Sequence, residues 1–256
     1  STPTTPNEIA SCLVGSEMCI RDSFNLDSNW VFLNEDDSLW LPATVPGTIH
    51  TDLINNHIID DPFYRLNEHN VQWIDKKDWR YKTVLEINKD ALNQQNIFLE
   101  FQGLDTYSSI LLNDSCILKT DNMFRTYSLD IKDQLKIGKN ILEVLFESTI
   151  KKGIEKREKL GYYPTISGND LSEIGKVQGN QKVSVYSRKA GYHFGWDWGP
   201  RLVTSGIWKP ITYQSWNNFK INDVYIQQDL QKDNVVLNAT VEIGFDKDYI
   251  GNELFI

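Results

Sequence analysis

The chain of 256 residues has only three cysteines, and none of them forms a C-x-x-C pair with another. An odd number of cysteines at these spacings (Cys12, Cys19 and Cys116) predicts neither a disulfide framework nor a structural zinc site. We expect no metal and no cofactor. The sequence also lacks any run of about 18 apolar residues, so no membrane-spanning helix is predicted.

Positive charge is scarce as well. Lys and Arg number 26 against 35 Asp and Glu, which gives a formal net charge of -9 at pH 7. An acidic surface is repelled by phosphate backbones and by anionic lipids. The balance of charge therefore argues against nucleic acids and anionic membranes as partners.

Residues 1–23 differ in character from the rest of the chain. Their apolar stretch, residues 10–20, is interrupted by Glu17 and has no Lys or Arg before it, which is not how a secretory leader is built. We interpret residues 1–23 as a non-native or disordered leader without a function. The peptide should accordingly be absent from native protein analysed by mass spectrometry.

From Phe24 onward the pattern is typical of short β-strands. Apolar and polar residues alternate in segments that are separated by Asn, Asp and Gly turn signals, namely 24–33, 79–87, 97–101, 106–112, 124–131 and 140–146. Many short strands with little helix predict an all-β fold, and for residues 24–215 a β-sandwich of the jelly-roll type.

A second series of strands begins after this region, with candidate strands at 219–227, 235–243 and 254–256. An immunoglobulin-like sandwich needs about seven strands in about 100 residues. We therefore expect residues 216–256 to be the start of a truncated immunoglobulin-like domain.

Two segments are predicted to be helical or irregular. A short helix is expected near residues 49–56; its His50 and His57 are seven residues apart, whereas a pair of metal ligands on a helix needs three or four. The strand pattern also lapses between Ser148 and Lys182. The charged part of this segment, residues 151–160, reads as a solvated helix face, and the remainder is placed at the rim of the functional site.

Aromatic residues are plentiful, with eight Trp in the chain, and one segment concentrates them beside a carboxylate. Trp196, Asp197 and Trp198 are bracketed by glycines and followed by a proline, so this segment should leave the sheet and turn. In a turn the three side chains can converge. Indole faces stack on the C–H faces of a sugar ring and a carboxylate accepts hydrogen bonds from its hydroxyls, so the triplet predicts sugar binding. The competing interpretation is that both Trp are core residues and Asp197 caps a turn.

Five segments together carry a family resemblance: residues 44–53, 61–64, 101–107, 121–125 and 188–201. They resemble the amino-terminal part of the β-mannosidases of glycoside hydrolase family 2. The resemblance implies a galactose-binding-domain-like jelly roll, an immunoglobulin-like domain and then a (β/α)₈ barrel. It also implies an exo-acting hydrolase that releases terminal β-linked mannose by a retaining mechanism, with two barrel glutamates as catalytic groups.

The resemblance assigns roles to individual residues of the 188–201 segment. The mannose that is cleaved would be contacted by Trp196, Asp197 and Trp198. We call the loop that carries these three residues the Trp-Asp-Trp loop. Three further residues of the segment would hold this loop in place: Arg188, His193 and Arg201. The chain ends before a barrel could begin, so we expect no catalytic residue in it, inactivity on its own, and docking of the loop onto the missing barrel. The expected partner is a β-mannoside glycan. The resemblance favours the periplasm, secretion or the lysosome as the compartment, and the cytoplasm stays open.

Two other functions remain open at this point. The loop could serve a free-standing carbohydrate-binding module without catalysis, or the chain could belong to a β-galactosidase or β-glucuronidase that has the same sandwich. A panel of aryl glycosides would separate these alternatives, because a site that hydrogen-bonds the axial 2-hydroxyl of mannose rejects sugars that lack it.

Overall fold

The computed structural model describes residues 22–161, 182–196, 199–232 and 234–245. The chain divides after Ser215 into two compact units. The first, residues 22–215, carries almost all of the fold, and the second begins at Trp216. None of the helices in the described ranges is long and apolar enough to cross a membrane.

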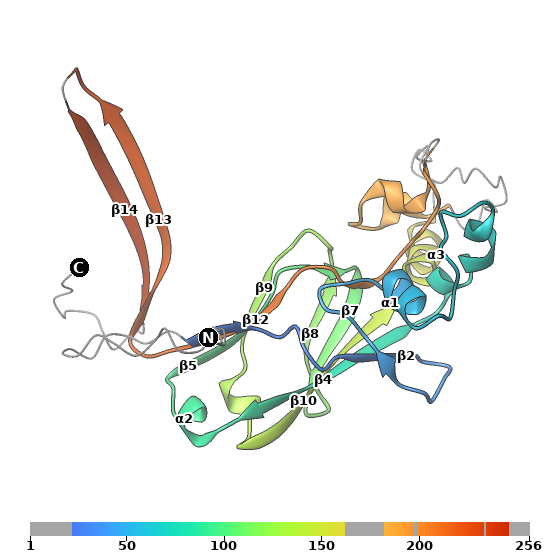
Figure 1. The fold of residues 1–256 in the computed structure, drawn as a ribbon, viewed down its shortest axis with the longest axis horizontal. Helices are drawn as coiled ribbons and strands as arrows, with labels where there is room; N and C mark the ends of the chain where they lie inside the picture. Colours follow the sequence, from blue (N-terminus) through green and yellow to red (C-terminus); the bar gives the residue numbers. More distant parts are fainter. Residues whose placement is uncertain (1–21, 162–181, 197–198, 233, 246–256) are drawn as a thin grey trace, which may run out of the picture. The chain divides into compact units, whose positions relative to one another are not determined.

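Two antiparallel sheets build the first unit (Figure 1). The smaller sheet has four strands in the order β1 (Asp22–Asn25), β12 (Ile211–Trp216), β5 (Asn96–Phe101) and β9 (Tyr127–Asp130). The larger sheet has six strands in the order β3 (Leu41–Pro42), β2 (Val31–Asn34), β4 (Trp79–Ile87), β10 (Gly138–Glu147), β7 (Tyr107–Leu112) and β8 (Ser115–Asp121). A short pair of strands, β6 (Leu104–Asp105) and β11 (Gly206–Ile207), lies outside both sheets.

The hydrophobic core lies between the two sheets. Side chains of a strand alternate between its faces, and β4 shows this directly, since every second residue from Trp79 to Ile87 is buried. The apolar face of β4 joins one continuous cluster with β10 of the same sheet and with β5 and β12 of the other. The prediction of an all-β sandwich is confirmed.

Individual strands agree with the prediction to different degrees. The strand predicted at 79–87 coincides with β4, but the single strand predicted at 24–33 is wrong. That segment forms β1 and β2, which belong to different sheets, because the chain turns at Asn29 with a φ of 59°. β1 begins at Asp22, so residues 22 and 23 pair with β12 although they were assigned to the leader. Residues 1–21 lie outside the described residues.

The helical elements are short, and α1 (Ile49–Asn55) lies where a helix was predicted. In Figure 1, α1 and α3 (Thr149–Leu160) lie at one end of the sandwich and α2 (Lys89–Leu92) at the other. The described ranges also contain five 3₁₀ segments, namely η2 (Asn67–Val71), η3 (Ile74–Lys76), η4 (Lys132–Gln134), η7 (Ser184–Tyr186) and η8 (Gly191–Phe194).

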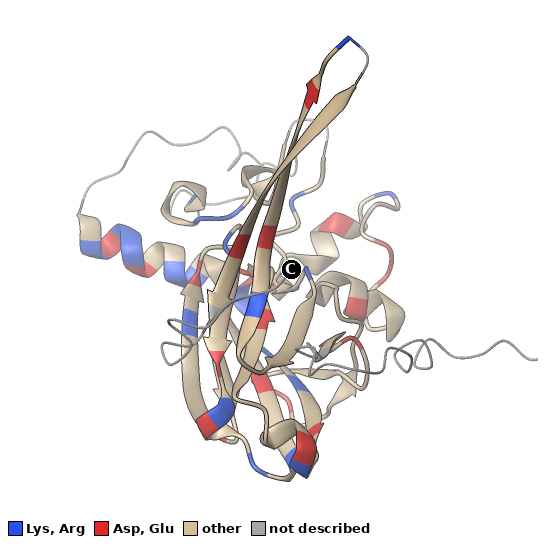
Figure 2. Cartoon of the chain, turned by 90° about the vertical axis from the view of Figure 1, so that its left-hand side faces the viewer, with Lys and Arg blue, Asp and Glu red and all other residues tan. Residues whose placement is uncertain are grey.

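The charged helix α3 is fixed at both ends and along one side. Ser148 caps its first turn by accepting a hydrogen bond from the backbone of Lys151, and Gly161 ends it in the left-handed conformation. Its buried side includes Gly153, where an added Cβ would lie 2.6 Å from carbons of Val183. Most of its charged residues face outward as predicted, and Figure 2 shows both signs along it.

The second unit contains a two-stranded antiparallel ribbon, β13 (Phe219–Leu230) and β14 (Val235–Phe245). A bulge between Ile221 and Asp223 shifts the register by one residue, so that Ile221 pairs with Ile243 and lies on the same face as the Val224–Val241 pair. The result is one apolar face and one polar face. That the ribbon starts an immunoglobulin-like sandwich stays a prediction.

Candidate functional site

The predicted sugar-binding triplet begins at Trp196, which forms one side of an antiparallel bridge. Trp196 and Gly199 form an antiparallel bridge, with N–H···O distances of 3.3 Å from Trp196 to Gly199 and 3.4 Å in the other direction. Gly195 precedes the bridge with a φ of 102°, a backbone conformation that favours glycine. The Trp196 side chain is 37% exposed. Asp197 and Trp198 lie outside the described residues, and their contacts stay predictions.

The segments before and after this bridge are named here its incoming and outgoing arms, and His193 connects them. Its Nδ1 lies 3.2 Å from the carbonyl oxygen of Leu202, which can only accept, so Nδ1 carries the proton of this bond. Burial, reinforced by the nearby Lys189 charge, lowers the pKa of His193 to about 4. The imidazole is therefore neutral at neutral pH, and its Nε2 keeps a free lone pair.

Arg201 fixes the outgoing arm to the η2–η3 segment. Its Nη1 donates to Gln72 Oε1 at 2.7 Å and to Asp75 Oδ2 at 2.6 Å. Its backbone is held as well, because its N–H donates to Glu68 Oε1 at 2.8 Å and its carbonyl accepts from Gln72 Nε2 at 2.8 Å. Four hydrogen bonds therefore place one residue that follows the bridge by only two positions.

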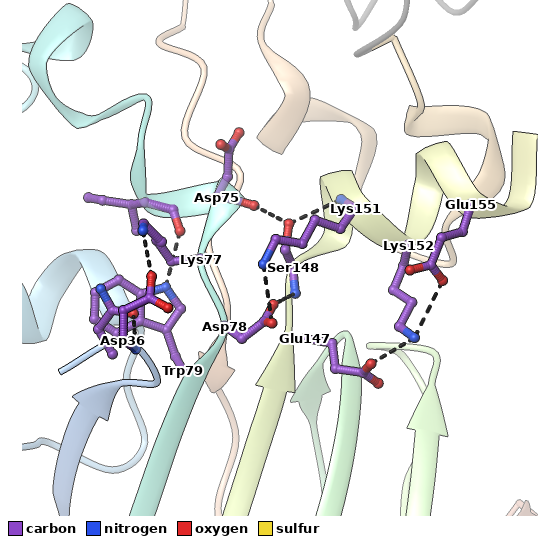
Figure 3. A network of polar contacts seen from close by, with 12 residues as sticks. Asp36, Asp75, Lys77, Asp78, Trp79, Glu147, Ser148, Lys151, Lys152 and Glu155 are labelled. Atoms are coloured by element: carbon purple, nitrogen blue, oxygen red, sulfur yellow. Dashed lines mark hydrogen bonds and ion pairs between the residues drawn. The ribbon is translucent and has the colours of Figure 1, made fainter. Parts of the chain in front are cut away.

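The partner carboxylate, Asp75, is itself part of a network around the start of α3 (Figure 3). Ser148 Oγ donates to the backbone oxygen of Asp75 at 2.5 Å, and the Ser148 N–H donates to Asp78 at 2.8 Å. Burial raises the pKa of Asp75, while the Arg201 charge acts in the opposite direction. The position of Arg201 thus depends on contacts that extend to α3.

Arg188 makes different contacts from His193 and Arg201, the other two residues that were predicted to support the loop. Its side chain is exposed and forms no ion pair or hydrogen bond with the described residues, whereas its backbone oxygen accepts from Met123 N at 3.0 Å. The neighbouring Lys189 is buried instead, forms an ion pair with Asp105, and donates to the carbonyl of Thr204 at 2.8 Å. Burial lowers the pKa of Lys189, and Asp105 opposes this effect.

The helix α1 places a second histidine beside these elements. His50 is 6% exposed, and its Nδ1 has no hydrogen-bond partner among the described residues. Burial, followed by the Lys189 charge, lowers the pKa of His50 to about 4, so this imidazole is also neutral at neutral pH. Among the residues that the structure describes, no group of His, Cys, Asp and Glu could hold a metal ion.

Asp52 anchors α1 to the sandwich. Its carboxylate accepts from Tyr81 Oη at 2.6 Å and from Thr44 N at 2.8 Å, and burial raises its pKa to about 6 against the effect of these two hydrogen bonds. The other side of α1 is held where Ile49 N donates to Ser205 O at 2.9 Å. The helix is therefore a fixed wall of the region that leads to Trp196.

A cavity of about 820 Å³ opens between α1 and the bridge. Its apolar and aromatic lining residues are Ile54, Pro62, Phe63, Tyr192, Trp196, Pro200 and Leu202. Its polar lining residues are Thr48, His50, Thr51, His193 and Thr204, and two glycines, Gly191 and Gly199, complete it. No Asp, Glu, Lys or Arg of the described chain lines this cavity.

Reasoning from the sequence placed His193 and Trp196 here but missed most of the surrounding residues. Phe63 and Asp105 belong to segments that carried the family resemblance, so a signal existed for them, although no role was derived from it. Lys189 also lies in such a segment, but its burial was not predicted. Asp75 and Gln72 gave no signal, because their function depends on burial and on contacts between segments far apart in the sequence.

Comparison with known proteins gives a consistent result. Residues 30–209 match the family described as glycosyl hydrolase 2 galactose-binding domain-like. The chain is 35% identical over 225 residues to the β-mannosidase of Bos taurus and 34% identical over 232 residues to β-mannosidase B of Emericella nidulans. These matches cover 88% and 89% of this chain but 25% and 26% of the relatives, so the chain spans about a quarter of their length.

Similarities to solved structures are consistent with these sequence matches. The β-D-mannosidase from Dictyoglomus thermophilum has a TM-score of 0.75 and 40% identity, over 88% of this chain and 26% of that chain. The β-D-glucuronidase from the same organism has a TM-score of 0.53 at 16% identity, over 90% of this chain and 34% of that chain. The second similarity shows the fold alone.

Proposed function

The chain belongs to glycoside hydrolase family 2, and from this premise we propose that it is the amino-terminal, substrate-contacting part of an exo-acting β-mannosidase. The observation that carries the proposal is the identity of 35–40% to β-mannosidases over 88% of the chain. Other glycosidases of the same fold, such as the glucuronidase, share only 16% of residues. The proposed substrate is a glycan with a terminal, non-reducing β-D-mannose residue.

In this proposal the Trp-Asp-Trp loop forms one wall of the subsite for the terminal mannose. Asp197 accepts hydrogen bonds from sugar hydroxyls, and the indoles of Trp196 and Trp198 cover the apolar face of the ring. His193 and Arg201 hold the two arms of the loop through Leu202 and Asp75. Arg188 contributes through its backbone, where it bridges to Asn122.

The proposed reaction proceeds with retention of configuration. Such a reaction needs two carboxyl groups about 5–5.5 Å apart, one as nucleophile and one as acid and base. Three buried carboxylates of the first unit, Asp52, Asp75 and Asp105, are each engaged in hydrogen bonds or ion pairs. We therefore assign both catalytic groups to a barrel domain outside these 256 residues, onto which the loop docks, and assign binding and orientation of the substrate to this chain.

The proposal is tested with the protein encoded by the full gene. Aryl β-mannoside, β-galactoside and β-glucuronide are compared by kcat/KM, and NMR identifies the anomer released first. We expect a preference for the mannoside of at least about 100-fold, because a site that hydrogen-bonds one hydroxyl geometry leaves groups unpaired with another, and we expect the β-anomer as first product. Binding without turnover would instead indicate a carbohydrate-binding module.

The 256-residue chain alone should give no β-mannosidase turnover, since positioning without a nucleophile and an acid does not provide a route to the transition state. The control is a covalent mannosidase inactivator added to the same preparation. Turnover that this inactivator abolishes would place catalytic groups in the chain and contradict the assignment.

A further inference from the structure

The cavity beside Trp196 is large for a site that would hold a single sugar. At about 820 Å³ it lies in the upper part of the range of ligand pockets, about 300–1,000 Å³. Trp196 lines the cavity and also forms the bridge that carries the Trp-Asp-Trp loop. The cavity therefore begins at the first residue of the loop to which the proposed function assigns the terminal mannose.

Aromatic rings form the exposed part of the cavity. The side chains of Phe63, Tyr192 and Trp196 are 72%, 64% and 37% exposed, so a ligand can reach these rings. Tyr192 also stacks on His193, with the ring centroids 4.7 Å apart, which fixes the plane of its ring. Flat, exposed rings at a cavity mouth provide stacking surfaces for the C–H faces of a saturated ring.

The hydrogen-bonding groups of the cavity are neutral. They are the hydroxyls of Thr48, Thr51 and Thr204 and the imidazoles of His50 and His193, and no Asp, Glu, Lys or Arg of the described residues joins them. Burial keeps the pKa of both imidazoles at about 4, so neither is a cation at neutral pH. Buried His50 Nδ1 also has no hydrogen-bond partner among the residues that the structure describes, and an unpartnered buried polar atom is rare in proteins. This lining disfavours phosphates and carboxylates, which need a cation or several N–H donors.

We propose that this cavity binds the second unit of the glycan, a neutral sugar to which the terminal mannose is attached. The ring of this sugar stacks on Phe63 and Tyr192, and its hydroxyl groups form hydrogen bonds with the threonines and imidazoles that line the cavity. This inference rests on the proposed function, which supplies the terminal mannose at the adjacent loop. It makes the chain a determinant of the leaving-group sugar as well as of the terminal residue.

The test compares two substrates that differ only beyond the scissile bond. β-Linked mannobiose fills both subsites, whereas β-mannosyl fluoride carries a single atom as leaving group. The variants are Phe63→Ala and Tyr192→Ala in the full-length enzyme, chosen because both side chains are exposed and their removal leaves the core intact. Ile137→Ala, which is 61% exposed and does not line the cavity, is the matched control.

We expect each aromatic variant to lower kcat/KM for mannobiose about five- to tenfold, as the loss of one stacking contact would. Turnover of β-mannosyl fluoride should be unchanged, and Ile137→Ala should affect neither substrate. Equal losses on both substrates would overturn the inference and indicate that another part of the enzyme occupies the cavity. If the aromatic variants lowered kcat/KM for neither substrate, the inference would be overturned as well. If the unaltered enzyme hydrolyses neither compound, the proposed function itself is wrong.

Discussion

Arg201 and Asp75 form a buried ion pair, with 2.6 Å between Nη1 and Oδ2, that joins positions 126 residues apart. Both side chains are less than 5% exposed. A buried charge without its partner is strongly destabilising, because water no longer compensates it. This pair therefore fixes the arm of the Trp-Asp-Trp loop to the η2–η3 segment.

Asp75→Asn is expected to lower the free energy of unfolding by about 3 kcal/mol, since it leaves the Arg201 guanidinium buried beside neutral groups. Urea denaturation followed by tryptophan fluorescence measures this. The matched control is Asp36→Asn, which breaks the exposed Lys77–Asp36 pair and should leave the denaturation midpoint unchanged. Equal effects of the two variants would show that burial of the Asp75 pair is unimportant.

Acid should destabilise the fold through His193. Burial lowers its folded-state pKa to about 4, while the unfolded chain binds a proton near 6.5. Between these values the unfolded state holds more protons, so stability falls as the pH is lowered. Relative to the unaltered chain, His193→Gln should therefore gain roughly 3 kcal/mol in the free energy of unfolding between pH 7 and pH 4.

Asp52→Asn provides the control of opposite sign. The pKa of Asp52 is raised to about 6, so between about pH 4 and pH 6 the folded state holds the extra proton and acid stabilises the native chain through this group. The variant should become less stable relative to the unaltered chain as the pH falls. If His193→Gln and Asp52→Asn changed in the same direction, the burial of one of them would be misassigned.

Gly153→Ala tests how closely α3 packs. Helix propensity alone would stabilise the variant by about 1 kcal/mol. The added Cβ would lie 2.6 Å from two carbons of Val183, and overpacking of this kind costs about 1–3 kcal/mol. We expect a lower Tm and a net loss of about 1 kcal/mol. Glu158→Ala, at an exposed position of the same helix, should change little; stabilisation by Gly153→Ala would contradict the close packing.

The sequence pattern predicted the interior of the sandwich better than its edges. β4 was predicted at its true bounds because both of its neighbours are strands and its apolar residues alternate with a period of two. β8 was missed because it is an edge strand with four polar residues in seven and little burial. The division of residues 24–33 into two strands was missed, because apolar residues stand on both sides of the turn at Asn29, the one residue of this segment with a positive φ.

The candidate site shows the same limit. Trp196 and His193 could be identified because they lie in one short, unusual segment. The burial of Lys189, which lies in the same segment, and the roles of Gln72 and Asp75 could not be identified, because a charged or amide residue has no local pattern that predicts burial. Their partners become evident only when β6, η2 and η3 are placed against residues 189–204.

For the full-length enzyme, two substitutions at Trp198 in the Trp-Asp-Trp loop are predicted to differ in their effect on kcat/KM. Trp198→Phe keeps an aromatic face for stacking and should reduce kcat/KM only a few-fold, whereas Trp198→Ala removes the face and should reduce it by about tenfold or more. An aryl β-mannoside assay measures both. Equal effects of the two variants would show that the indole is needed for its N–H or its shape rather than for its aromatic face.

The most direct test of the central claim is kcat/KM for an aryl β-mannoside with Asp197→Ala in the full-length enzyme. Each hydrogen bond from a sugar hydroxyl to this carboxylate is worth about 1.5–3 kcal/mol, so a loss of roughly 10- to 150-fold is predicted, with the unfolding midpoint unchanged. A change of less than twofold would show that Asp197 is structural and that this chain does not contact the mannose through it.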